Sequence, residues 1–249
     1  MEQIRWTRSS GHRVAPLLVL FDLDDTLCDY TTARQTRLRI ALGTALESAG
    51  IRHPDLDRLV EESIAIQPHA SDHFPALLTR HGVHDPELHA AARNWYHQNR
   101  FHGLELYPEA LTVLRSVRTH PNVTAVGLVT NGPSDVQRDK INLLNLESEL
   151  DFVIISGDVG FEKPHPGIFE AALSAGCAQP HQTFFVGDSD EFDMVGAINA
   201  GLTPIWINRI GRPWQLPSPP PPYTVCNLTA LLELFDEQNC SSQACSRTG

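Results

Sequence analysis

The chain has 249 residues, more than one average domain and fewer than two large ones, so a core domain with a modest insertion is expected. Its 19 basic and 30 acidic residues give a net charge of −11, which argues against a nucleic-acid polymer or an anionic membrane surface as a standing partner. No apolar run approaches the roughly 20 residues of a membrane helix. The five cysteines are scattered without metal-site or redox spacing, which is typical of reduced thiols in a cytoplasmic protein.

Short apolar segments predict the strands of a parallel sheet, because each is rich in β-branched or aromatic residues and is followed closely by polar residues or glycine. These segments are residues 16–21, 123–129, 152–155, 183–186 and 204–207. Helical spacing of apolar residues lies between them, at 111–117, 136–146, 168–175 and 194–200. The alternation predicts an α/β fold with a doubly wound, Rossmann-like parallel sheet. Ligands of such sheets bind at the carboxyl ends of the strands.

One connection breaks this alternation, because about 100 residues separate the first two predicted strands and a crossover needs only about 10 to 12. The intervening sequence predicts helices at 31–49, 55–66, 73–80 and 86–99, so we expect residues 30–105 to form an all-helical inserted domain. The remaining boundaries are a core of 16–29 with 106–237, a flexible N-terminal tail of 1–15 and a disordered C-terminal tail of 238–249.

The C-terminal part of the core carries a proline-rich run at residues 217–222, which predicts a stiff, extended connector. A docking site for a proline-recognising partner is the less favoured alternative, because short proline motifs often occur by chance. Residues 223–225 and 228–235 predict a further strand and helix.

Three carboxylates, those of Asp22, Asp24 and Asp25, follow the first predicted strand within four residues. Crowded carboxylates repel one another, and a divalent ion that prefers oxygen ligands would relieve this repulsion, as Mg²⁺ commonly does. The same run can equally be a turn whose aspartates cap the local backbone. Taken alone, it favours neither interpretation.

Two further segments offer groups that could bind an anion. Thr130, Asn131 and Gly132 end the second predicted strand just before a helix, whose N-terminus favours negative charge, although an ordinary capping arrangement is the better interpretation of this segment alone. Lys163 precedes Pro164 in a segment whose prolines favour an extended backbone and would hold the ammonium group in a defined place. An isolated lysine is usually only solvated.

The fourth predicted strand ends in another acidic segment, residues 187–193, which carries four carboxylates. Together with Asp22 and Asp24, Asp188 could complete a site for a hard metal ion. An acidic N-cap and first helical turn, favoured by the helix dipole, is an alternative of similar weight.

Taken together and in this order, the four segments resemble the four motifs of the haloacid dehalogenase (HAD) superfamily over roughly residues 16–235. The stretch from residue 130 to residue 169 resembles the branch that contains N-acylneuraminate-9-phosphatases and pyrimidine 5′-nucleotidases. This resemblance implies a phosphatase whose helical insertion is a C1-type cap. It also implies a small-molecule substrate that the cap encloses.

The resemblance assigns the chemical steps to particular residues. Asp22 would be the nucleophile that becomes an aspartyl-phosphate, and Asp24 would act as general acid and then as general base. Thr130 and Asn131 would bind the phosphate, and Lys163 would pair with both Asp22 and the transferring group.

The resemblance also implies a Mg²⁺ cofactor. The Asp22 carboxylate, the Asp24 main-chain carbonyl and the Asp188 carboxylate would hold the ion, and Asp193 would orient its water molecules. Phe192 departs from the small polar residue that many relatives carry before Asp193, which puts the outer surroundings of the metal in doubt.

The expected function is therefore Mg²⁺-dependent hydrolysis of a small phosphorylated metabolite, a nucleoside monophosphate or a sugar phosphate, by a monomer or homodimer. A dehalogenase is disfavoured by Asp24, since carbon–halogen cleavage needs no proton donor, and a phosphonatase would need a lysine within residues 30–105, which contain none. A phosphomutase remains open, although such relatives usually carry Gly in place of Asp25. A catalytically inactive binding protein is the third alternative.

Histidines are frequent in the expected insertion and could suggest a transition-metal site. They are scattered over several predicted helices and loops, so we expect surface histidines instead. They are His53, His69, His73, His81, His84, His89, His97 and His102.

Overall fold

A computed structural model describes residues 17–52, 56–66 and 73–234 of the chain. These residues divide into two compact units, one made of the chain up to Leu27 and from Leu106 onward, the other of Cys28–Glu105. The two expected tails lie outside the described residues, as do His53 and His69. Within the described part of the chain, no helix is long and apolar enough to cross a membrane.

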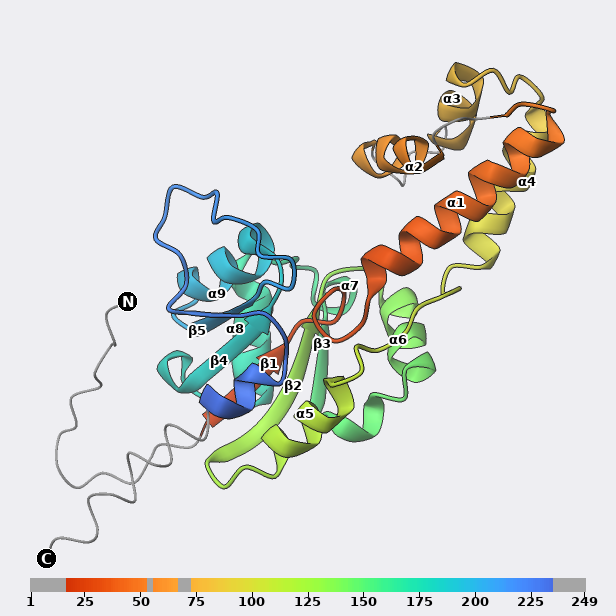
Figure 1. Cartoon of the computed structure of the whole chain (residues 1–249). Coiled ribbons are helices and arrows are strands. Elements are labelled where there is room, and N and C mark those ends of the chain that lie inside the picture. The colour runs from red at the N-terminus through yellow and green to blue at the C-terminus, as the bar shows by residue number, and fades with distance from the viewer. Residues whose placement is uncertain (1–16, 53–55, 67–72, 235–249) are drawn as a thin grey trace, which may run out of the picture. The chain divides into compact units, whose positions relative to one another are not determined.

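The first unit is built on a six-stranded sheet in which every neighbouring pair of strands is parallel (Figure 1). The strand order is β3-β2-β1-β4-β5-β6, so β2 and β3 lie on one side of β1 and β4, β5 and β6 lie on the other. This topology confirms the doubly wound α/β fold that the sequence predicts. The strands are β1 (Leu17–Phe21), β2 (Val123–Thr130), β3 (Phe152–Ile155), β4 (Thr183–Gly187), β5 (Thr203–Ile207) and β6 (Tyr223–Val225).

Helices alternate with these strands along the chain. They are α5 (Ala110–Arg118), α6 (Ser134–Leu143), α7 (Ser156–Val159), α8 (Pro166–Ala175) and α9 (Val195–Asn199). The sequence predicts that α6 extends to residue 146, but the helix ends at Leu143 because Asn145 adopts a left-handed conformation with φ of 53°. A single π-helical turn, Asp190–Met194, precedes α9 and places the last acidic residues at the end of β4.

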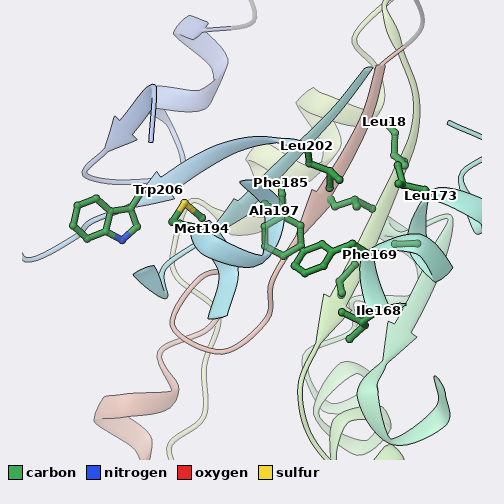
Figure 2. Close-up of a cluster of buried hydrophobic side chains, with 12 residues drawn as sticks. Leu18, Ile168, Phe169, Leu173, Phe185, Met194, Ala197, Leu202 and Trp206 are labelled. Atoms are coloured by element: carbon green, nitrogen blue, oxygen red, sulfur yellow. The ribbon is translucent and has the colours of Figure 1, made fainter. Parts of the chain in front are cut away.

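A hydrophobic core joins α8 and α9 to one face of the sheet (Figure 2). Leu18 and Leu20 of β1 belong to this cluster, and residues at alternate positions of a strand point to the same face. At its centre Phe169 of α8 packs edge-to-face on Phe185 of β4, with ring centroids 5.2 Å apart. This packing fixes the strands whose carboxyl ends carry the polar segments.

The second unit contains only helices among its described residues: α1 (Tyr30–Ser48), α2 (Leu56–Ala65), α3 (His73–Arg80) and α4 (Pro86–Gln98). It has a hydrophobic core of its own, which includes Leu42, Leu59 and Leu77. Two histidines expected at the surface are buried instead. His73 Nε2 is hydrogen-bonded to Ser63 Oγ, and His89 Nε2 is hydrogen-bonded to the main-chain carbonyl of Val83, so each buried ring has a polar partner at Nε2.

Candidate active site

The carboxyl ends of three adjacent strands bring distant segments together. Asp22 directly follows β1, and its main-chain N–H donates to the carbonyl of Val186 in β4 at 2.9 Å. Thr130 is the last residue of β2, on the other side of β1, and Asp188 directly follows β4. The sheet topology therefore collects the predicted site residues at one edge, next to the point where the strand order reverses.

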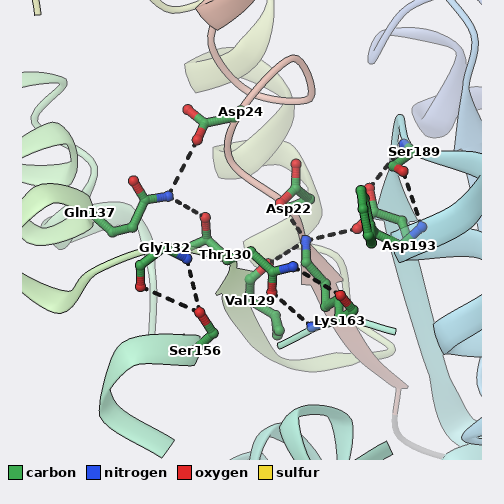
Figure 3. A network of polar contacts seen from close by, with 12 residues as sticks. Asp22, Asp24, Val129, Thr130, Gly132, Gln137, Ser156, Lys163, Ser189 and Asp193 are labelled. Atoms are coloured by element: carbon green, nitrogen blue, oxygen red, sulfur yellow. Dashed lines mark hydrogen bonds and ion pairs between the residues drawn. The ribbon is translucent and has the colours of Figure 1, made fainter. Parts of the chain in front are cut away.

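Lys163 lies at the centre of this site, as Figure 3 shows. It is almost fully buried, with 3% of its surface exposed. Its Nζ donates to Asp22 Oδ1 at 2.5 Å and to the Val129 carbonyl at 3.1 Å, and it lies 2.7 Å from Asp193 Oδ1. Burial opposes the charged form, but the adjacent Asp193 and Asp22 carboxylates outweigh it and raise the pKa of Lys163 above its ordinary value. The charged form of Lys163 is therefore favoured next to Asp22.

Asn131 holds the segment that carries Lys163. Its side-chain Oδ1 accepts from the Lys163 main-chain N–H at 2.8 Å, and its Nδ2 donates to the Lys163 carbonyl at 3.0 Å. This pair of hydrogen bonds ties two segments 32 residues apart in the sequence. The predicted role of Asn131 in binding phosphate stays a prediction.

An acidic cluster next to Lys163 has the composition expected of a site for a hard cation. Carboxylate oxygens of Asp22, Asp188 and Asp193 lie within 4.8 Å of one another. Burial raises the pKa of Asp22 to about 7, because the attraction of Lys163 only partly compensates for lost solvation and Asp193 adds repulsion. Burial, with repulsion from Asp193 and Asp22, raises the pKa of Asp188 to about 8. A divalent cation would stabilise these anions, so the donor set fits Mg²⁺.

Close packing fixes the position of Asp193 within this cluster. A Cβ atom on Gly187 would lie 2.4 Å from Asp193 Oδ2, so the carboxylate occupies the space that a side chain at residue 187 would need. The main-chain N–H of Ser189 donates to the same oxygen at 3.0 Å. The neighbouring Phe192, which departs from the pattern of the resembled family, is 46% exposed.

The side chain of Asp24 lies against α6. Lys140 Nζ donates to Asp24 Oδ1 at 2.8 Å and to Oδ2 at 2.6 Å, and Gln137 Nε2 lies 3.3 Å from Oδ2. The same Gln137 nitrogen donates to Thr130 Oγ1 at 2.5 Å. Sequence reasoning did not identify Gln137 or Lys140. The sequence contains one sign of their role. Gln137 and Lys140 are three positions apart, so they share a helix face, and this face also carries the apolar Ile141.

Two side chains near β5 hold the main chain of Asp188. Trp206 Nε1 donates to the Asp188 carbonyl at 2.7 Å, and Arg212 Nη2 donates to the same oxygen at 2.8 Å. Neither residue was predicted as part of the site. A tryptophan within an apolar strand reads as a core residue, so the sequence does not indicate that its ring N–H donates a hydrogen bond to a neighbouring loop.

Comparisons with known proteins show what this chain is similar to. A family model described as haloacid dehalogenase-like hydrolase matches residues 17–201. The glyceraldehyde 3-phosphate phosphatase of Pyrococcus furiosus is 31% identical over 243 residues, which cover 93% of this chain and 98% of that protein. The N-acylneuraminate-9-phosphatase of Mus musculus is 27% identical over 89% of this chain and 94% of its own length.

A comparison of structures gives the same fold. A magnesium-bound HAD-hydrolase from Bacillus subtilis superposes with a TM-score of 0.69 at 22% sequence identity, covering 89% of this chain and 99% of that one. At this level of identity the similarity concerns the fold alone.

Proposed function

Because this chain belongs to the haloacid dehalogenase-like hydrolase family, we propose that it is a Mg²⁺-dependent phosphoric monoester hydrolase with Asp22 as its nucleophile. The observation that carries the proposal is the contact between Asp22 and Lys163 inside an acidic cluster. A carboxylate beside a buried ammonium group can approach an anionic phosphate ester, because the positive charge reduces their repulsion.

The reaction has two displacements. An oxygen of the Asp22 carboxylate forms a bond to phosphorus while the bond from phosphorus to the leaving oxygen breaks, and Asp24, which enters this step protonated, gives its proton to that oxygen and becomes a carboxylate. A water oxygen then bonds to phosphorus as the bond to Asp22 breaks, and Asp24 takes the proton of the water. The products are the alcohol and inorganic phosphate, and both aspartates return to their starting states.

The other site residues position the phosphoryl group and neutralise its charge. Thr130 and Asn131 at the end of β2 bind the phosphate oxygens, and Lys163 contacts both the nucleophile and the transferring group. Asn131 has a second task in this scheme, because it fixes the main chain of Lys163.

Mg²⁺ would be held by the carboxylates of Asp22 and Asp188 and by the main-chain carbonyl of Asp24, with Asp193 orienting the water molecules of the ion. When bound, the ion supplies positive charge that neutralises the phosphoryl oxygens. Burial, together with repulsion from neighbouring carboxylates, raises the pKa of Asp188 to about 8, and this supports the assignment because an added cation would stabilise the ionised form.

The substrate is a small phosphorylated metabolite, a sugar phosphate or a nucleoside monophosphate. The two relatives described above are named for glyceraldehyde 3-phosphate and N-acylneuraminate 9-phosphate, which favours a phosphorylated sugar or sugar-like acid. Residues 30–105 serve as a cap that selects among such molecules. The enzyme acts in the cytoplasm as a monomer or homodimer, and the scattered spacing of the five cysteines supports this location.

The test is phosphate release from a panel of sugar phosphates and nucleoside monophosphates with Mg²⁺, comparing the wild type with Asp22→Asn. We expect release by the wild type that a chelator abolishes, and no release above background by the variant, because an amide is a far weaker nucleophile than a carboxylate. Acid-quenched wild type should also carry a phosphoryl group on Asp22 that peptide mass spectrometry detects.

Asp139→Asn is the matched control, because it makes the same change at an exposed position of α6 and should retain activity. Phosphate release that persists in Asp22→Asn would exclude Asp22 as the nucleophile. Absence of release by the wild type, with transfer of phosphate between positions of one sugar, would indicate a mutase, and absence of both would indicate a binding protein.

A further inference from the structure

Lysine is rare in this chain, and each of its two lysines is buried against an aspartate that follows β1. Of 19 basic residues only Lys140 and Lys163 are lysines, and the rest are arginines. Both are buried, with 4% and 3% of their surface exposed. Lys163 contacts Asp22 and Lys140 contacts Asp24, so each lysine pairs with one of the two aspartates that the proposed reaction uses. Both lysine ammonium groups of the chain therefore contact a carboxylate of the proposed site.

The contacts of Lys140 fix both oxygens of the Asp24 carboxylate. The ammonium nitrogen lies 2.8 Å from Oδ1 and 2.6 Å from Oδ2, and Gln137 Nε2 approaches Oδ2 at 3.3 Å. Asp24 itself keeps a quarter of its side-chain surface exposed, whereas the side chain of Lys140 is 5% exposed. A carboxylate with these donor contacts has a defined orientation, and part of its surface remains accessible.

Gln137 links this aspartate to the phosphate-binding end of β2. Its amide nitrogen donates to Thr130 Oγ1 at 2.5 Å while also facing Asp24, as Figure 3 shows. Gln137 is 1% exposed, so its side chain has little freedom to rotate. The hydroxyl predicted to bind phosphate and the carboxylate predicted to move the proton are thus held at a fixed separation by one side chain.

Stability by itself does not explain why Lys140 and Gln137 are buried here. Burying an ammonium group requires desolvation, and replacing a buried ion pair by apolar residues of similar volume is often neutral or stabilising. Helix α6 nevertheless presents Gln137 and Lys140, three residues apart, on the same buried face as Ile141. A requirement for a defined position of Asp24 accounts for keeping the pair.

We propose that Lys140 and Gln137 are positioning residues that hold the Asp24 carboxylate beside Thr130, in reach of the leaving oxygen of the substrate. The proposal rests on the proposed function, in which Asp24 transfers the proton. General acid–base catalysis requires hydrogen-bond reach of the reacting oxygen, so a carboxylate that swings freely is less effective than one held in place.

The kinetic test compares wild type, Lys140→Met and Lys140→Arg. For Lys140→Met we expect kcat to fall roughly 10- to 100-fold with little change in KM, because phosphate binding is kept while proton transfer is misaligned. The burst of leaving group in a single turnover should slow much less for p-nitrophenyl phosphate, whose leaving oxygen needs little protonation, than for an alkyl phosphate. Lys140→Arg should recover part of the lost kcat.

Arg138→Met is the matched control, because Arg138 is an exposed basic residue on the same helix and pairs with Asp158 rather than with the site. It should leave kcat and KM near their wild-type values. Thermal unfolding of each variant separates misfolding from mispositioning. A folded Lys140→Met enzyme with unchanged or increased kcat would overturn the proposal, as would equal losses for aryl and alkyl substrates in the burst.

A double-mutant cycle with Asp24→Asn tests whether Lys140 acts through Asp24. If it does, Lys140→Met should change the residual kcat of Asp24→Asn by less than about 2-fold, whereas independent effects would multiply. Multiplying losses in an active enzyme would overturn the positioning role and leave the proposed function intact. An inactive wild type, or an Asp24→Asn enzyme with full activity, would instead overturn the proposed function.

The pairing itself has a spectroscopic test that needs no activity. Protein labelled with [15N]lysine has only two side-chain ammonium signals, because the chain has two lysines, and Lys140→Met assigns them by removing one. Asp24→Asn should move the Lys140 signal or broaden it through solvent exchange, with a smaller change at Lys163. An unmoved Lys140 signal would overturn the contact on which the proposal is built.

Discussion

Charge balance at the site depends on a few buried side chains. Asp22, Asp188 and Asp193 present carboxylates within 4.8 Å of one another, and Lys163 is the cation that contacts both Asp22 and Asp193. One ammonium group cannot neutralise three carboxylates, so the metal-free site retains repulsion that a divalent ion would relieve. Replacing one of these aspartates should therefore stabilise the metal-free protein and weaken its binding of the metal.

We expect Asp188→Asn to stabilise the metal-free protein slightly near neutral pH, because a carboxyl group whose pKa rises from 3.8 to about 8 on folding disfavours the folded state at this pH. The same change should weaken the stabilisation by Mg²⁺. For the wild type, Mg²⁺ at about 100 times its dissociation constant should raise the free energy of unfolding by about 2.7 kcal/mol. Thermal unfolding with and without Mg²⁺ measures both effects. An equal Mg²⁺ response in Asp188→Asn would remove Asp188 from the metal site.

Between elements, one arginine connects three segments of the first unit. Arg209 follows β5, donates to Glu109 Oε1 at 2.8 Å at the start of α5, and donates to the carbonyl of Thr26 at 3.2 Å beyond β1. Its guanidinium group also lies 3.4 Å from the centre of the Tyr107 ring. Partial burial opposes ionisation of Glu109, but the hydrogen bond from Arg209 outweighs it and holds the pKa of this carboxyl below 4.5.

We expect Glu109→Gln to lower the free energy of unfolding by about 1 kcal/mol near neutral pH, a value kept small by solvent screening of a partly exposed pair. A pKa that is depressed on folding stabilises the protein above the unfolded value of 4.5, and this contribution disappears as the pH falls through the folded value. The difference between variant and wild type should therefore shrink in acid.

Urea unfolding near neutral pH and well below pH 4.5 measures this difference. Glu170→Gln, an exposed change on α8, is the control and should have little effect at either pH. A Glu109→Gln difference that stays constant with pH would show that the charge of Glu109 does not contribute to stability.

At the scale of the whole molecule, the chain forms two units with separate hydrophobic cores. Leu77 is fully buried among the helices of residues 28–105, and Leu114 is fully buried in α5 of the other unit. Separate cores allow one unit to lose stability without the other, since cooperative unfolding follows contiguous packing.

We therefore expect Leu77→Ala, which leaves a cavity costing about 2 to 5 kcal/mol, to accelerate amide hydrogen exchange mainly within residues 28–105. Leu114→Ala is the reciprocal variant and should accelerate exchange in the sheet unit. Hydrogen exchange followed by mass spectrometry locates each effect. Faster exchange across both units in either variant would show that the two cores unfold together.

The sequence by itself determined the order of strands and helices, the helical insertion and the acidic or polar residues at the strand ends. Apolar periodicity is local, and polar residues that follow a buried strand must lie at the edge of the sheet. The position at the strand ends made Asp22, Thr130 and Asp188 candidates, and the resemblance of their segments to the four family motifs assigned them to one site.

Only the tertiary structure decided which side chains support that site. Lys140 and Asp24 are 116 residues apart, Asn131 and Lys163 are 32 apart, and their contacts depend on how α6 and the Lys163 segment pack beside the sheet. The burial of His73 follows from packing between helices. The end of α6 at Leu143 follows from the left-handed conformation of Asn145. Local patterns specify elements, but the partner of a polar side chain depends on which distant surfaces meet.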